Sequence, residues 1–249
     1  MLRSLEELHG YTIHATDGDI GTVHAFLFDD KTWAIRYLVV DTGAWLPGRQ
    51  VLLSPVALGQ PDWEGQFFPV KLTTEQVQNS PDIDTEKSVS RQQETLLHTY
   101  YDWPTYWSAD SLLGHDAVAA YPGGLLMTEP YEILPAEQGD PHLQSSRDVI
   151  GYYIQAHDGQ IGHVEDFIVD TEAWAIRYMA VDTVNWWPGK KVLIAVTWIE
   201  YVAWAESLVH VDLSRDRVKD SPEFDPTAPV NRGYESRLYD YYGRPAYWP

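Results

Sequence analysis

The stretch Trp33-Ala-Ile-Arg-Tyr-Leu-Val-Val-Asp-Thr42 decides the fold, because a second version of it, Trp174-Ala-Ile-Arg-Tyr-Met-Ala-Val-Asp-Thr183, follows later in the chain. Each version is rich in β-branched and aromatic residues and ends at Asp-Thr, which is typical of a strand that closes into a turn. Side chains alternate between the two faces of a strand, and both faces of this one are mostly apolar. The sequence therefore predicts a strand buried on both sides, as in the covered wall of a small barrel.

The similarity between the two halves extends far beyond this strand. Residues 2–107 align with residues 143–248 without a gap, at an offset of 174 − 33 = 141 residues. Among the matched pairs are Gly10-Tyr11 with Gly151-Tyr152, Ile20-Gly21 with Ile161-Gly162, and Val51-Leu52 with Val192-Leu193. We therefore predict two domains, 1–107 and 143–249, joined by an acidic linker with Pro and Gly at 108–142.

Within the first repeat, several short strands are separated by turn residues, which is typical of a small barrel or sandwich. The expected strands are 10–15, 23–29, 33–42, 50–53 and 66–72, the last at an edge because it contains Pro69. Thr73 and Ser90 are the expected N-caps of two short helices, and Ser90-Arg91-Gln92-Gln93 fits a capping box. Each repeat ends in an aromatic tail. The predicted fold is mainly β, with two small barrels that are each followed by short helices and such a tail.

Composition narrows the possible classes of protein. The 17 basic and 37 acidic residues give a net charge of −20, which argues against binding to nucleic acid or to an anionic membrane. Without cysteine, the chain has no disulfides or thiolate metal sites. Neither a signal peptide nor an apolar run of about 20 residues is evident. We expect a cytoplasmic protein with no integral membrane segment.

At this level of detail the chain resembles the PRC-barrel family, as a tandem bacterial form with two copies of the domain. The residues that carry the resemblance are Gly18, Ile20-Gly21, Val23, the strand from Trp33 to Asp41, Arg49 to Leu53, and their counterparts in the second repeat. Downstream, Ser80-Pro81, Arg91 with Glu94, and Tyr101-x-x-Pro104-x-Tyr106-Trp107 resemble the C-terminal extension of stand-alone bacterial members.

The resemblance implies a small β-barrel that serves as a docking module. Relatives of this kind include the cytoplasmic domain of the photosynthetic reaction-centre H subunit and the C-terminal domain of a ribosome maturation factor. The membrane helix of the first and the RNA-handling domain of the second have no counterpart in this sequence. The family has no general catalytic residues to transfer.

Two arginines lie in the middle of the repeated strand among apolar neighbours. A buried arginine needs a partner, so we expect Arg36 to pair with Asp29 or Asp41, and Arg177 with Asp170 or Asp182. An anionic ligand is the alternative. Arg91 with Glu94, and Arg232 with Glu235, have the i,i+3 spacing of a surface pair on a helix.

The aromatic tails are the other candidate interaction sites. The candidate interaction residues are Arg36, Arg177, Tyr101, Tyr106, Trp107, Tyr242, Tyr247 and Trp248. Tyr and Trp fill cores but also dominate interfaces, so each tail either packs on its own domain or lies in a seam. A pseudo-twofold pairing of the two domains is the second arrangement.

Two histidines flank the first turn of each repeat. If the hairpin is symmetric about residue 19, His14 faces His24, and His157 faces His163 in the second repeat. Coincidence in polar hairpins is one interpretation, and metal binding or pH sensing is the other.

No catalytic, phosphate-binding or dinucleotide motif is present, and no cofactor is expected. The leading hypothesis is a non-enzymatic protein-binding or scaffold module with an unknown protein partner. Alternatives are an accessory protein of a photosynthetic or electron-transfer membrane complex, and a ribosome-assembly factor that binds a ribosomal protein. A hydrolase with an unrecognised carboxylate site is the remaining alternative.

Overall fold

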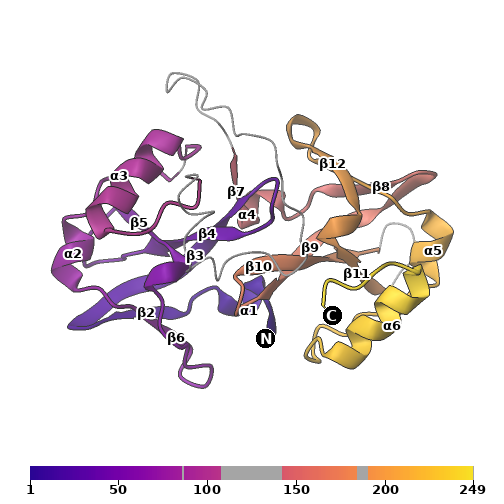
Figure 1. Cartoon of the computed structure of the whole chain (residues 1–249), viewed down its shortest axis with the longest axis horizontal. Helices are drawn as coiled ribbons and strands as arrows, with labels where there is room; N and C mark the ends of the chain where they lie inside the picture. Colours follow the sequence, from indigo (N-terminus) through magenta and orange to yellow (C-terminus); the bar gives the residue numbers. More distant parts are fainter. Residues whose placement is uncertain (86, 108–141, 184–189, 249) are drawn as a thin grey trace. The chain divides into compact units, whose positions relative to one another are not determined.

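The computed structural model describes residues 1–85, 87–107, 142–183 and 190–248. The protein is mainly β, with two mixed sheets and short helices, as the sequence predicts (Figure 1). The chain forms two compact units. Unit 1 consists of Met1–Glu7 and Ser146–Pro249, and unit 2 consists of Leu8–Ser145.

Unit 2 is built on a six-stranded sheet. Its elements are β2 (Thr12–Ala15), β3 (Gly18–Asp29), β4 (Ile35–Asp41), β5 (Gln50–Leu53), η1 (Pro55–Ala57), β6 (Phe67–Pro69), α2 (Thr74–Gln78), α3 (Arg91–Tyr101) and β7 (Leu143–Ser145). The strand order is β5-β4-β3-β2-β6, and β7 pairs with β3. β6 runs parallel to β2, whereas the other recorded pairs are antiparallel. Pro69 therefore lies on the last strand of the order, as predicted.

Unit 1 is built on a seven-stranded sheet of the order β11-β10-β9-β8-β13-β12, with β1 paired to β9. Its strands are β1 (Leu2–Ser4), β8 (Tyr153–Ala156), β9 (Gly159–Asp170), β10 (Ala175–Asp182), β11 (Lys191–Ala195), β12 (Ile199–Ala203) and β13 (Leu208–Val211). Its helices are α4 (Ser146–Val149), η3 (Val196–Trp198), η4 (Trp204–Glu206), α5 (Arg215–Lys219) and α6 (Arg232–Tyr242). One further helix, α1 (Leu5–Leu8), contains the boundary between Glu7 of unit 1 and Leu8 of unit 2.

The strand that opens each repeat belongs to the sheet of the other repeat. β1 lies antiparallel to residues 168–170 of β9, and β7 lies antiparallel to residues 27–29 of β3. The sequence offset relates β1 to β7 and β9 to β3, so the exchange is reciprocal. The bounds of the two units differ from the predicted domain bounds for this reason: the opening residues of each repeat are transferred to the other unit.

The repeated strand begins two residues later than predicted, at Ile35 in β4. Trp33 has a left-handed backbone with φ 59°, and its counterpart Trp174 has φ 48°, so both tryptophans end a turn. The prediction that both faces of the strand are buried is confirmed, because every residue from Ile35 to Val40 is buried except the partly exposed Arg36.

The helix signals are also confirmed. Thr73 and Ser90 each accept a hydrogen bond from the third helical residue, and the glutamine there returns one, which completes a capping box on α2 and on α3. α3 and α6 each have 11 residues. In the described parts of the chain, no helix is long and apolar enough to cross a membrane.

Gly21 and Gly162, matched by the repeat, mark a close approach between two strands. A Cβ atom on either glycine would lie 2.0 Å from a backbone oxygen, that of Asp41 or Asp182. Only glycine therefore lets the long hairpin strand run this close to its neighbour.

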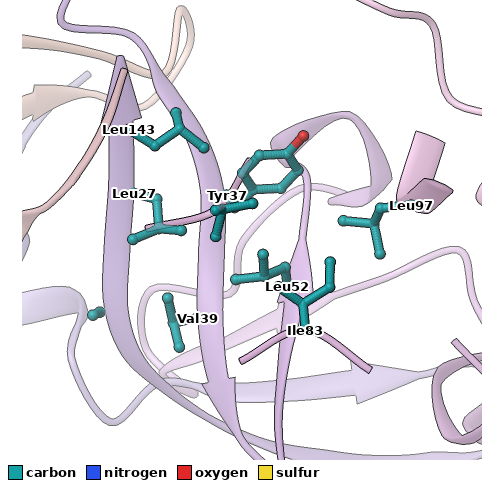
Figure 2. Packing of buried hydrophobic residues seen from close by; sticks show 9 residues of the cluster. Leu27, Tyr37, Val39, Leu52, Ile83, Leu97 and Leu143 are labelled. Carbon is teal, nitrogen blue, oxygen red and sulfur yellow. The ribbon is translucent and has the colours of Figure 1, made fainter. Parts of the chain in front are cut away.

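One cluster of the apolar core of unit 2 lies between the sheet and the segment that leads into α3. Figure 2 shows Leu143 of β7 beside Leu27 of β3 and Tyr37 of β4, with Leu97 of α3 and Ile83 on the other side of the Tyr37 ring. The exchanged strand thus supplies a core side chain as well as backbone pairing. Burial of a leucine of this kind contributes roughly 1.5–3 kcal/mol.

Candidate functional site

A buried carboxylate lies beneath the aromatic tail of unit 2. Glu94 of α3 is fully buried, and its Oε2 atom lies 2.8 Å from Arg91 Nη1 and 2.8 Å from His142 Nε2. Its Oε1 atom accepts hydrogen bonds from the hydroxyls of Tyr106, at 2.5 Å, and Tyr37, at 3.0 Å. Arg91 and Glu94 do pair, but the prediction that the pair lies on the surface is wrong, because α3 turns the Glu94 side chain into the core.

Burial and hydrogen bonding have opposite effects on the pKa of Glu94. Burial by itself raises the pKa, but the contacts with His142 and Arg91 outweigh it and lower the pKa below its ordinary value. Burial raises the pKa of Tyr37 and of Tyr106. A general base that works near neutral pH needs a pKa close to 7 and access to substrate. Glu94 is fully buried and its pKa is lowered, so it has neither property.

Unit 1 contains the same cluster with one member changed. Glu235 of α6 is buried, its Oε1 atom lies 2.7 Å from each of the Tyr178 and Tyr247 hydroxyls, and its Oε2 atom lies 3.1 Å from Arg232. The residue that corresponds to His142 is Met1, whose side chain is exposed. The histidine is thus specific to unit 2. No pattern in the sequence points to it, because it precedes the second repeat and acts on the first.

Both mid-strand arginines pair with one of the two carboxylates predicted for them. Arg36 Nη2 lies 3.7 Å from Asp29, and Arg177 Nη2 lies 3.4 Å from Asp170. The guanidinium groups also stack on the tails, with Arg36 3.8 Å from the ring centre of Tyr106. Cation–π stacking of a largely shielded arginine stabilises by roughly 1–2 kcal/mol.

The two aromatic tails pack on their own units. Trp107 contacts the ring of His98 at 4.8 Å and lies under Arg91, while Trp248 contacts Tyr239 at 5.0 Å and lies under Arg232. The remaining predicted interaction residues also pack within their units: Tyr101 stacks on Trp103, Tyr242 packs against Trp198 with tilted rings, and Tyr247 lies under Arg177. These residues therefore close the cores of their units.

The histidine pairs predicted for the two hairpins do not form. The turns are tighter than the symmetry argument assumes and occupy residues 16–17 and 157–158, so His14 lies opposite Asp19 and His163 lies opposite Tyr153. His14 Nδ1 lies 2.7 Å from Asp19, and His24 is part of β3 beyond the paired segment. His157 lies in the turn itself, 3.3 Å from Asp212 and 3.7 Å from Glu200.

A cleft of about 370 Å³ opens in unit 1 beside the exchanged strand β1. Its apolar lining includes Leu2, Ile168, Phe224 and Val230. The residues that correspond to these in unit 2 are Leu143, Leu27, Ile83 and Val89, which all belong to the core cluster. The cleft is therefore a less completely filled version of the same packing, next to a loop that contains Pro226 and Pro229.

An exposed aromatic face distinguishes unit 1 from unit 2. Tyr153 of β8 and Tyr201 of β12 are 47% and 55% exposed. The strand register puts both on the face that also carries His210 of β13, and His210 stacks on Tyr201 with ring centres 4.2 Å apart. In the first repeat, Thr12, Gln60 and Pro69 take these three positions.

β12 also provides a strand edge beside this face. It is the last strand in the sheet order of unit 1, and in the described residues no further strand pairs with its outer side. An edge strand presents backbone N–H and C=O groups that can pair with an added strand. The sequence carried no periodic signal for this surface, because the repeat in the first half lacks its aromatic residues.

Comparison with known proteins gives little further information. No family model matches the chain. An uncharacterised protein of Deinococcus radiodurans is 35% identical over 82 residues, which are 32% of this chain and 29% of that protein. The similarity thus spans less than a third of the relative's length.

Proposed function

We propose that the chain is a non-enzymatic protein-binding or scaffold module, built from two small PRC-type β-barrels. The proposed binding surface consists of the aromatic face with Tyr153, Tyr201 and His210, together with the free edge of β12. The observation that carries the proposal is the exposure of two tyrosines on one sheet face beside an edge strand. Exposed tyrosines are enriched among the residues that dominate protein interfaces.

The kind of partner follows from the edge and from the charge. An extended segment of a partner protein can add to β12 as a further strand and place alternate side chains against Tyr201 and His210. Strand addition also has a precedent within this chain, since both sheets include a strand from outside their own repeat. With a net charge of −20, the protein favours a neutral or basic partner segment over an acidic one.

The test is photo-crosslinking from two matched positions. A photoreactive phenylalanine analogue replaces Tyr201 in one variant and Gln60, its exposed counterpart in the first repeat, in the other. We expect a discrete protein adduct from position 201 and none from position 60. The partner identified in this way is then purified for binding measurements.

Binding to the purified partner gives the decisive number. Tyr201→Ala should raise the dissociation constant about tenfold or more, as expected for an interface tyrosine that contributes more than roughly 1.4 kcal/mol. Gln60→Ala should leave it unchanged. Equal effects of the two substitutions would contradict the proposal, because the aromatic face would then play no special part.

A further inference from the structure

Three side chains with metal-binding atoms converge at one end of the unit 1 sheet. His157 lies in the turn after β8, Glu200 lies in β12, and Asp212 follows β13. The Nε2 atom of His157 lies 3.3 Å from Oδ1 of Asp212 and 3.7 Å from Oε1 of Glu200, and the three ligand atoms all lie within 4.8 Å of one another. All three side chains are about half exposed, so an ion can reach them from solvent.

The distances fit a tetrahedral metal ion better than a hydrogen-bonded cluster. The distances from Nε2 of His157 to Asp212 and to Glu200 are both longer than the roughly 2.7–3.2 Å of an N–H···O hydrogen bond. Zinc binds imidazole nitrogen and carboxylate oxygen at about 2.0–2.1 Å in tetrahedral geometry, which places neighbouring ligand atoms about 3.3 Å apart. Calcium and magnesium prefer oxygen ligands alone, whereas this group includes an imidazole nitrogen.

The surrounding residues hold the ligands in place. The backbone N–H of His157 donates to the carbonyl of Leu213, and the backbone N–H of Asp212 donates to the carbonyl of Trp198. Glu200 falls where the register between β12 and β13 shifts, and an irregularity of this kind changes the direction of a side chain. The ligands thus project from a sheet end that is fixed by backbone pairing.

Arg244 fixes the orientation of the aspartate from the other side. It contacts Oδ2 of Asp212 and also donates to the Asp212 carbonyl at 2.9 Å, which leaves Oδ1 directed at His157. Partners of this type orient the ligands of metal sites.

The first repeat provides an internal comparison. Thr16, Gly59, Lys71 and Trp103 take the positions of His157, Glu200, Asp212 and Arg244. All three ligands and the orienting arginine are therefore present together in the second repeat and absent together from the first. General acidity does not account for this difference, since both repeats belong to the same acidic chain.

We propose that His157, Glu200 and Asp212 bind one zinc ion, with the fourth tetrahedral position open to water. This site is independent of the proposed protein-binding surface, although Glu200 and Tyr201 are neighbours in β12. Imidazole and carboxylate ligands together suit zinc among the divalent ions.

Isothermal titration of the full chain with zinc alone, after chelator treatment, tests the site. We expect one equivalent to bind with a dissociation constant on the order of micromolar, since three exposed ligands bind less tightly than a closed structural site. His157→Ala and Glu200→Gln should each weaken binding at least tenfold. The control is His14→Ala, which removes a histidine 2.7 Å from a carboxylate in the other hairpin and should leave binding unchanged.

Cobalt as a replacement ion gives a second measurement that does not depend on stability. A tetrahedral site gives bound cobalt strong visible absorption, which should be present in the native protein and in His14→Ala and be lost in His157→Ala. Absence of zinc binding would overturn the proposal. Binding that persists in both His157→Ala and Glu200→Gln would overturn it as well, because the zinc would then be held elsewhere.

Discussion

The Nε2 atom of His142 lies 2.8 Å from Oε2 of Glu94, and both side chains are buried. His142 directly precedes β7, the strand that joins the sheet of unit 2, and its backbone carbonyl accepts a hydrogen bond from Asp30. The pair therefore connects the exchanged strand to the helix α3. A buried pair of this kind is more important for holding one arrangement than for net stability, since both groups lose their hydration.

Replacement of His142 should weaken unit 2 strongly. In His142→Ala, Glu94 keeps Arg91 and the tyrosine hydroxyls but loses one buried polar partner, so we expect the free energy of unfolding to fall by about 2–3 kcal/mol. Urea denaturation followed by tryptophan fluorescence measures this change. His14→Ala in the exposed hairpin of the same unit is the control, with an expected loss of less than about 0.5 kcal/mol. Equal losses would show that the buried pair has no special role.

Acid should destabilise unit 2 through Glu94. The pKa of Glu94 in the folded protein lies below its ordinary value of 4.5. A carboxylate with a lowered pKa stabilises the fold fully above the unfolded pKa, and this contribution is lost as the pH falls through the folded pKa. Below pH 4.5, the melting temperature of the wild type should therefore fall more steeply than that of Glu94→Gln.

The exposed Glu64→Gln is the matched control for the acid experiment, because it removes the same charge from the surface. Its melting temperature should follow the pH dependence of the wild type. If Glu94→Gln and the wild type show parallel curves down to acid unfolding, the carboxylate of Glu94 does not carry the acid sensitivity.

A single hydroxyl should anchor the exchanged strand of unit 1. Ser4 of β1 donates to the partly buried carboxylate of Asp166, which also accepts from the backbone N–H of Phe167 at 2.7 Å. Ser4→Ala should cost about 1.5–3 kcal/mol, as for other hydrogen bonds to charged groups, and should speed amide exchange in residues 2–4. Hydrogen exchange followed by mass spectrometry measures the local effect.

Ser145 of β7 offers the control, because it corresponds to Ser4 in the repeat. The position of Asp166 is taken there by Ala25, whose side chain has no acceptor. Ser145→Ala should therefore leave exchange in β7 nearly unchanged. A comparable increase in both strands would exclude the carboxylate as the anchor.

The bounds of unit 2 predict which fragment of the chain folds more stably. Residues 8–145 include β7 and the His142–Glu94 pair, whereas residues 1–107 lack both and carry β1 without its partner β9. The fragment 8–145 should melt cooperatively as a monomer, and at a higher temperature than 1–107. Circular dichroism and light scattering compare the two. Identical melting of both fragments would mean that β7 contributes nothing to the unit.

The sequence by itself determined the local and the repeated features. Two copies of a strand that is mostly apolar on both faces predicted two β units, and the capping residues Thr73 and Ser90 predicted the starts of α2 and α3. Arg36 among apolar neighbours predicted a carboxylate partner, which is Asp29. These features depend on residues close together in the chain, or on the repeat, where the second copy provides independent support.

Only the tertiary structure decided which segments meet. Nothing in three-residue strands such as β1 and β7 states which sheet they join, because either sheet could pair with their backbone. The symmetric hairpin proposed for His14 and His24 was wrong, since a tight two-residue turn moves the register and sets His14 opposite Asp19. His157 was noticed in the sequence, but its neighbours Glu200 and Asp212 come from strands much farther along the chain. Such contacts depend on the packing of distant elements, which local pattern does not encode.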